Sequence, residues 1–99
     1  MIKIIFHPNG FTATGHAYSA KYGSDLVCAG ASAILMGSLN WFNSSSTTII
    51  VDNNFIKVYD EQNNINHLLE LINIQLKAMV TETNKKYVSI QHDQELLHK

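Results

Sequence analysis

The chain has 99 residues, of which 45% are apolar and 15% are charged, and its formal net charge is −1. This length suits one domain over residues 1–99, and the seven basic residues form no stripe of the kind that nucleic-acid backbones attract. The low charge favours self-association, and the single cysteine, which makes no internal disulfide, is typical of a reducing compartment.

The amino terminus does not resemble a secretory leader. The segment MIKIIFHPNG lacks a basic start, a long apolar core and a small-residue cleavage site. The uncharged run from Leu26 to Val51 is interrupted by glycines, asparagines and a serine triplet, so we expect no membrane span there. We therefore predict a cytoplasmic protein without a membrane partner.

The amino-terminal part of the chain predicts a β-hairpin followed by a loop. Residues Ile2–Phe6 are apolar and β-prone, and the sequence HPNG closes them. Proline presets a turn and Asn-Gly tolerates positive φ, so a second strand is expected over Phe11–Ala17. The segment Gly15-His16-Ala17 then lies at the far end of that strand, and a loop follows over Tyr18–Gly23.

A helix is predicted from Ser24 to about Asn43. Ser24 is a good N-cap, and Asp25 complements the positive end of the helix dipole. The segment is rich in alanine, leucine and methionine and in small residues, and it has little polar surface. Such a helix is expected to be central and buried.

The second half predicts a hairpin, a helix and a last strand. The hairpin is expected over Thr47–Val51 and Phe55–Tyr59, and Asn63 or Asn64 is expected to cap the next helix. A strand over Tyr87–Gln91 precedes a polar tail. The order is therefore β-β-α-β-β-α-β, and because hairpins dominate, we predict a two-layer α+β domain with a mixed or antiparallel sheet.

The residues that suggest chemistry are Cys28 and His16. If the helix begins at Ser24, Cys28 lies at the end of the first turn, where the positive helix end favours a thiolate. A histidine is tunable near neutral pH and is a candidate base. Helical spacing places Asp25, Cys28 and Ser32 on one face, where Asp25 or Ser32 would orient the reacting groups.

Two questions stay open from these residues alone. Free amides at the helix start would hold an oxyanion if the cap lies at Asp25 or later, whereas a cap at Ser24 leaves the Cys28 amide bonded inside the helix. A lone cysteine on an apolar helix is also more often a small core residue than a nucleophile. The remaining histidines have no partner at metal-ligand spacing, so neither a metal nor another cofactor is expected.

One ordered motif covers about a quarter of the chain. Its residues are GHA at 15–17, then a loop, then YGSDLVCAGAS at 22–32, which AILMGSLN continues. This motif resembles that of the ribosomal-processing cysteine proteases, the Prp family. The likeness is specific because it places the histidine, the glycines, the acid and the cysteine in one order.

The resemblance implies a cysteine endopeptidase that removes the N-terminal extension of a large-subunit ribosomal protein precursor, a step needed for ribosome maturation. It implies a catalytic dyad of His16 and Cys28, with Gly15, Asp25 and Ser32 as supporting motif residues. It also implies a homodimer and a mobile substrate loop of Tyr18, Ser19, Ala20, Lys21, Tyr22 and Gly23. The alternative is a catalytically silent, ribosome-associated dimeric binding protein, in which Cys28 would be unreactive.

Overall fold

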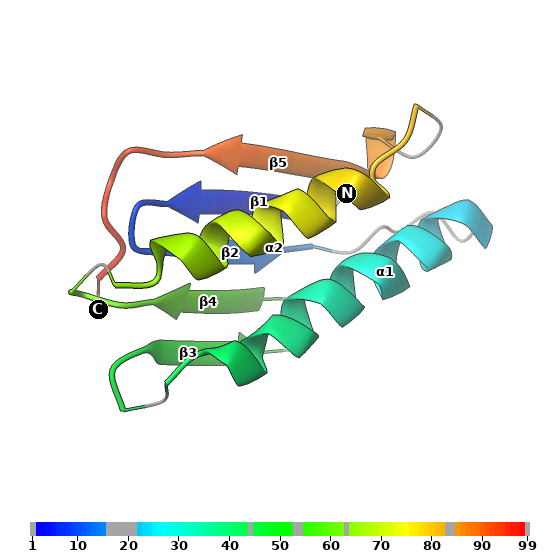
Figure 1. Ribbon diagram of the computed structural model, residues 1–99. Coiled ribbons are helices and arrows are strands. Elements are labelled where there is room, and N and C mark those ends of the chain that lie inside the picture. The colour runs from blue at the N-terminus through cyan, green and yellow to red at the C-terminus, as the bar shows by residue number, and fades with distance from the viewer. Residues whose placement is uncertain are drawn as a thin grey trace.

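The computed structural model describes residues 2–15, 22–43, 45–52, 55–62, 64–82 and 85–98, with the backbone alone for residues 22–28. It is an α+β fold, as predicted (Figure 1). The elements in chain order are β1 (Ile2–His7), β2 (Gly10–Thr14), α1 (Tyr22–Ser38), the 3-10 turn η1 (Leu39–Trp41), β3 (Thr48–Asp52), β4 (Phe55–Tyr59), α2 (Asn66–Met79), the 3-10 turn η2 (Lys85–Tyr87) and β5 (Val88–His92).

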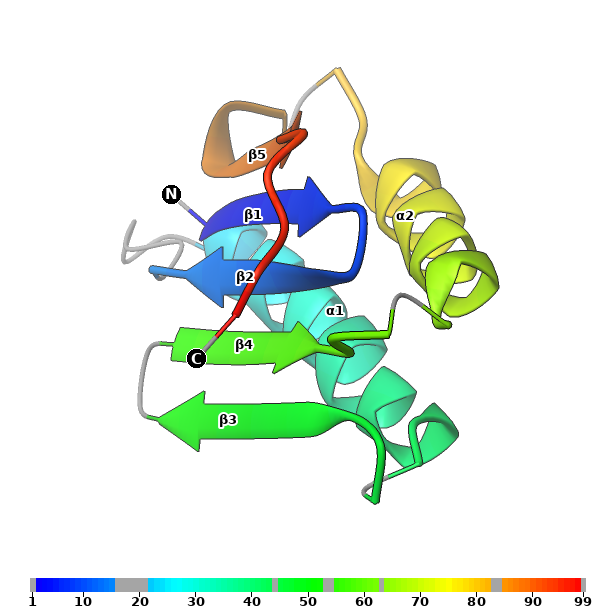
Figure 2. The ribbon, with the colours of Figure 1, turned by 90° about the vertical axis from the view of Figure 1, so that its left-hand side faces the viewer.

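The five strands form one mixed sheet in the order β3-β4-β2-β1-β5. The pairs β1–β2, β2–β4 and β3–β4 are antiparallel, and β1–β5 is parallel. The predicted HPNG hairpin is present, because His7 pairs with Gly10 across the two-residue connection. The outer strands of the sheet are β3 and β5 (Figure 2).

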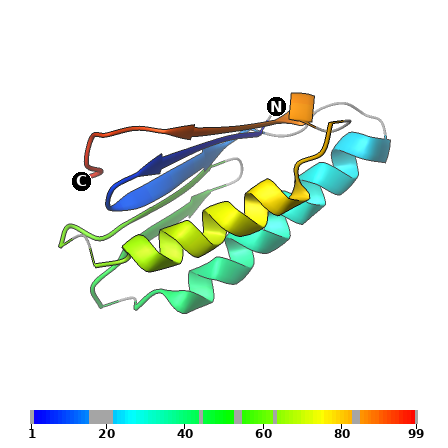
Figure 3. The same cartoon turned by 45° about the horizontal axis from the view of Figure 1, so that its top comes forward.

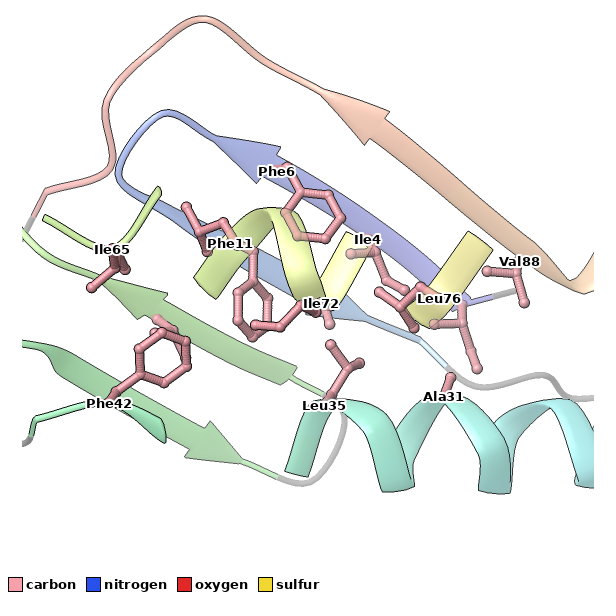
Figure 4. Close-up of a cluster of buried hydrophobic side chains, with 14 residues drawn as sticks. Ile4, Phe6, Phe11, Ala31, Leu35, Phe42, Ile65, Ile72, Leu76 and Val88 are labelled. Carbon is pink, nitrogen blue, oxygen red and sulfur yellow. The ribbon is translucent and has the colours of Figure 1, made fainter. Parts of the chain in front are cut away.

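Both helices cover the same face of the sheet, which gives the two predicted layers (Figure 3). Alternate strand residues point into the space between the layers, as the period of two requires. Ile4, Phe11 and Val58 from the sheet and Ile72 and Leu76 from α2 are fully buried there (Figure 4). From α1, Ala31 and Leu35 complete this core.

The helix α1 is not buried on all sides, contrary to the expectation from its composition. Ala31, Leu35 and Ser38 are buried, whereas Ser32, Ala33 and Met36 are exposed. Two helices share one face of the sheet, so each of them contributes one side to the core and leaves the other to solvent. The solvent-facing side of α1 is therefore partly apolar, because Ala33 and Met36 lie on it.

Both ends of α1 differ from the prediction. The helix begins at Tyr22 rather than Ser24, and it ends at Ser38 before the 3-10 turn η1. Gly23 does not prevent the early start, because one glycine costs a helix only about 1 kcal/mol. At the other end the Ser38 hydroxyl donates to the Leu35 carbonyl at 2.7 Å, and a tighter 3-10 turn is common at such ends.

The helix α2 presents the predicted apolar face to the core through Leu69, Ile72 and Leu76. Its N-cap is Ile65, without a side-chain capping bond, so the expected cap at Asn64 is wrong. The buried Ile65 anchors the helix start by packing instead. Asn63 lies outside the described residues.

The polar tail that follows β5 is held against the strand ends. We call residues 93–98 the C-terminal strap. The Asp93 amide donates to the Phe6 carbonyl at 2.8 Å. The Asn9 side chain, only 1% exposed, donates to the Leu97 carbonyl and accepts from the Leu97 amide, both at 2.7 Å. Lys57 Nζ adds a bond to the His98 carbonyl at 3.1 Å. The strap is thus fixed mainly through its own backbone.

Replacing Asn9 by alanine is expected to release the strap. The change removes two hydrogen bonds, each worth about 1 kcal/mol, so the free energy of unfolding should fall by about 2 kcal/mol. Amide hydrogen exchange at Leu97 should become faster, which NMR measures directly. The exposed Asn40, whose one side-chain bond is 3.3 Å long, provides the control, because Asn40→Ala should change stability by less than about 0.5 kcal/mol. Unchanged protection at Leu97 in Asn9→Ala would contradict this role.

Candidate active site

The strand β2 ends at Thr14, and Gly15 follows with a positive φ of 90°. The expected strand over Phe11–Ala17 is therefore too long. The left-handed conformation favours glycine, because a Cβ is strained there. Gly15 is exposed, and its left-handed conformation ends the extended backbone of β2.

The helix α1 begins at the same end of the molecule at which β2 ends (Figure 1). Its first turns extend beyond the end of α2, as Figure 3 shows. The two helices meet at Gly30, where an added Cβ would lie 2.9 Å from Met79 Sδ. The segment before Gly30, which contains Cys28, is therefore not covered by the body of α2.

The backbone position of Cys28 lies on the side of α1 that faces the sheet. Positions 28, 31, 35 and 38 follow steps of three, four and three residues, which keep to one side of a helix. The last three of these positions are buried. The predicted neighbour Ser32 is four residues after Cys28 and is exposed at the flank of this stripe. Position 28 thus continues the core stripe toward the start of α1, with the exposed Ser32 at its flank.

The early start of α1 changes the expected role of the helix end. Cys28 is the seventh residue of α1 rather than a first-turn residue. Only the first four amides of a helix are unbonded, and the dipole effect fades within the first turn. The condition for an oxyanion site at the helix start, a cap at Asp25 or later, is therefore not met, and position 28 lies beyond the turn in which the helix dipole acts.

Several predicted site residues lie outside what the structure describes. His16 and the loop residues Tyr18–Lys21 are among them, as is the side chain of Asp25. Tyr22 and Gly23 belong to α1, so the prediction that the loop includes these two residues is wrong. The helical backbone continues through them, which shortens the connection between Gly15 and α1.

A comparison with protein families decides where this chain belongs. Residues 1–89 match the family model described as cysteine protease Prp. The chain belongs to the Prp family of cysteine proteases. The match runs from β1 to the first two residues of β5 and ends before the C-terminal strap. The resemblance seen in residues 15–40 therefore extends over nearly the whole fold.

Curated Prp relatives agree with this assignment. The ribosomal processing cysteine protease Prp of Mycoplasma genitalium is 35% identical over 83 residues, which are 80% of this chain and 84% of the relative. That of Mycoplasma pneumoniae is 44% identical over 52 residues, about half of each chain. The Staphylococcus aureus protein is 65% identical over 26 residues, 26% of this chain and 24% of that one.

Solved Prp structures share the fold. A crystal structure of the S. aureus ribosomal processing protease Prp in complex with a substrate peptide aligns with a TM-score of 0.73. It covers 96% of this chain and 100% of that chain, at 24% sequence identity. A second S. aureus structure, with a covalently linked product peptide, aligns with a TM-score of 0.72 over 94% of this chain and 100% of that one, also at 24% identity.

The described residues have two further properties relevant to function. No described helix is both long and apolar enough to cross a membrane. Within the same residues, no three histidine, cysteine, aspartate or glutamate side chains are grouped so that they would hold a metal ion. Sequence inspection missed the C-terminal strap, because its two bonds to Asn9 join residues 88 positions apart and use backbone groups of the strap.

Proposed function

We propose that this chain is a cysteine endopeptidase that removes the N-terminal extension from the precursor of a large-subunit ribosomal protein. The family match over residues 1–89 is the observation that carries this proposal. The curated relatives bear the name ribosomal processing cysteine protease. Under this function the enzyme works in the cytoplasm, where ribosomal proteins are made.

In the proposed mechanism His16 takes the proton of the Cys28 thiol, and the thiolate attacks the scissile carbonyl carbon. The peptide C–N bond then breaks, the leaving amine receives the proton from His16, and the acyl group remains on sulfur as a thioester. Water, deprotonated by His16, hydrolyses the thioester and restores the thiol. The covalently linked product peptide on the S. aureus protease supports a covalent route of this kind.

The described backbone supports a meeting of His16 and Cys28. Gly15 ends β2 with a turn of the chain, and position 28 lies on the sheet-facing side of α1 at the same end of the molecule. Asp25 and Ser32 are proposed to orient the reacting groups rather than to react. Ser32 is exposed next to this stripe, which leaves its hydroxyl accessible. Tyr18–Lys21, with Tyr22 and Gly23 at the helix start, are proposed to contact the substrate.

The rate of thiol alkylation tests the proposed dyad, because the chain contains one cysteine. With His16 as its partner, Cys28 should react rapidly at neutral pH. An ordinary thiol has a pKa of about 8.5 and is only a few per cent ionised at pH 7, so His16→Ala should slow labelling by about 30-fold. A slow, alkaline profile already present in the unmodified protein would instead favour the catalytically silent binding protein.

We also propose that the homodimer expected for this chain forms through the edge strand β3. This strand exposes Ile50 by 44% and Val51 by 49%, and it contains no proline or lysine of the kind that usually protects an edge. The other edge of the sheet, β5, instead exposes the polar Gln91 and His92. An apolar edge whose one charged residue, Asp52, lies at the end of the strand favours pairing with another chain.

The sequence of β3 suits antiparallel pairing with a second copy. A two-fold arrangement centred on Ile50 places Ile49 opposite Val51 of the second copy, and Ile50 opposite itself. Thr48 then lies opposite Asp52 of the second copy, where a hydroxyl meets a carboxylate. Each apolar residue therefore faces an apolar residue on both sides of the joined sheet, which is the pairing that stabilises strands.

Replacing Ile50 by lysine is expected to give a monomer. Two like charges would then face each other at the centre of the paired strands, which disfavours the contact. Analytical ultracentrifugation should show a dimer for the unmodified protein and a weakening of at least about 100-fold for Ile50→Lys. The control is Leu71→Lys on α2, because Leu71 is similarly exposed at 47% but lies outside β3. A dimer that resists Ile50→Lys and dissociates in Leu71→Lys would contradict this interface.

A further inference from the structure

A small hollow lies between the start of α2 and the ends of β1 and β5. Its volume is about 200 Å³, and it is lined by Phe6, His7, Asn66, Leu69, Glu70, Asn73 and His92. These strand ends lie at the opposite end of the molecule from the start of α1 (Figure 1). The hollow is therefore separate from the candidate active site.

The side of the hollow that borders the core is apolar and aromatic. Phe6 and Leu69 are both buried in the core. The His92 ring stacks on Phe6, with ring centroids 5.6 Å apart and an interplanar angle of 23°. The exposed imidazole therefore presents a flat ring beside the hollow, onto which a second planar group can stack.

The polar lining groups offer hydrogen-bond acceptors. His7 Nδ1 lies 2.9 Å from the Glu95 carbonyl oxygen, which only accepts, so Nδ1 carries the proton. In the neutral ring, Nε2 is then left with a lone pair. Glu70 is exposed and has neither an ion pair nor a hydrogen bond with another described residue. Asn73 Oδ1 is buried and also lacks a partner among those residues.

The size and charge of the hollow narrow the class of ligand. Small-molecule sites usually measure about 300–1,000 Å³, so this volume suits one side chain of a polypeptide better. Glu70 is the formally charged lining group when both histidines are neutral, which favours a cation. The acceptors are not grouped as in a metal site. A guanidinium carries five donors in a fixed plane, which suits acceptors that lie apart around an aromatic ring.

We infer that this hollow binds an arginine side chain of a polypeptide partner. The aliphatic stem lies along Phe6 and Leu69, the guanidinium plane stacks on His92, and its N–H groups donate to Glu70 and to His7 Nε2. This inference rests on the proposed function: the partner is the ribosomal protein precursor, and the bound arginine lies at a distance from the peptide bond that is cleaved. The hollow then increases affinity for whole precursor rather than for a short peptide.

A direct binding experiment tests the site without any need for catalysis. The full chain, ¹⁵N-labelled, is titrated with N-acetyl-arginine methylamide, and with the neutral citrulline analogue as the matched probe. The expected result is a set of NMR shifts confined to His7, residues 66–73 and His92, with a dissociation constant on the order of 1 mM. Glu70→Gln should weaken binding about tenfold, whereas Glu61→Gln should have no effect, because Glu61 is exposed outside the hollow.

Equal shifts with the citrulline probe, or the absence of shifts around the hollow, would overturn the inference. Kinetics then separate the site from the proposed function. If the chain cleaves its precursor, Glu70→Gln should raise KM for the whole precursor about fivefold and leave kcat, and both constants for a short extension peptide, unchanged. Cleavage with an unchanged KM contradicts the binding role, whereas binding of arginine without any cleavage contradicts only the proposed function.

Discussion

Replacing Cys28 by alanine is expected to abolish cleavage of the precursor while the protein stays folded. The proposed nucleophile is lost, and removal of a nucleophile from a catalytic set typically lowers kcat by 10⁴-fold or more, as an order of magnitude. Position 28 lies within the helical backbone of α1, and alanine is small and has the highest helix propensity. The midpoint temperature of thermal unfolding, Tm, should therefore change by only a few degrees.

The matched control for this variant is Ala33→Ser, at an exposed position of the same helix outside the proposed dyad. Its cleavage rate should remain within about twofold of the unmodified protein, since exposed substitutions of this size have small effects. Both rates are measured from the appearance of the shortened protein by mass spectrometry. Cleavage by Cys28→Ala at the rate of the Ala33→Ser control would show that another group performs the attack.

Replacing Gly10 by alanine is expected to cause a large loss of stability, because backbone atoms of β4 lie against this glycine. Gly10 pairs with Tyr59 across β2 and β4, and an added Cβ would overlap the Val58 carbonyl oxygen. It would also lie 2.8 Å from Tyr59 Cα, so backbone must move rather than a flexible side chain. We expect the free energy of unfolding to fall by about 3 kcal/mol, at the upper end of ordinary overpacking.

The control for Gly10 is Gly37 in α1, where an added Cβ would meet nothing within 4 Å. Gly37→Ala should stabilise the protein by about 0.5–1 kcal/mol, because alanine is the better helix former. Denaturant unfolding measures both changes, and in a chain of this length 3 kcal/mol corresponds to a fall in Tm of roughly 12–24 °C. Equal stability of Gly10→Ala and the unmodified protein would mean that β2 and β4 are less closely packed.

The HPNG hairpin shows how a correct prediction can rest on an incomplete reason. Proline and Asn-Gly correctly indicated a turn between β1 and β2. However, Gly10 does not need a positive φ in this chain; it is required because Tyr59 of β4 approaches so closely. The buried Asn9 likewise serves the C-terminal strap. Contacts with residues far along the chain decide both positions, and no local pattern encodes those contacts.

The family of this chain was predictable from the sequence, whereas the start of α1 was not. The order of Gly15, His16 and Cys28 indicated the Prp family, and the match over residues 1–89 confirms that family. The sequence predicts the start of α1 two residues too late, because Ser24 has the chemistry of an N-cap while Gly23 disfavours a helix only weakly. Because of this difference, Cys28 lies in the second helical turn rather than at the end of the first, where the helix dipole would favour a thiolate.

The measurement that tests the proposed function most directly is the intact mass of the ribosomal protein precursor after incubation with this protein. The substrates are the precursor with its N-terminal extension and the same protein without it, each with the unmodified enzyme, Cys28→Ala and His16→Ala. The proposal predicts one cut, at the end of the extension, by the unmodified enzyme alone and no change in the shorter protein. An intact precursor, together with slow alkylation of Cys28 at neutral pH, would contradict the protease and favour the silent binding protein.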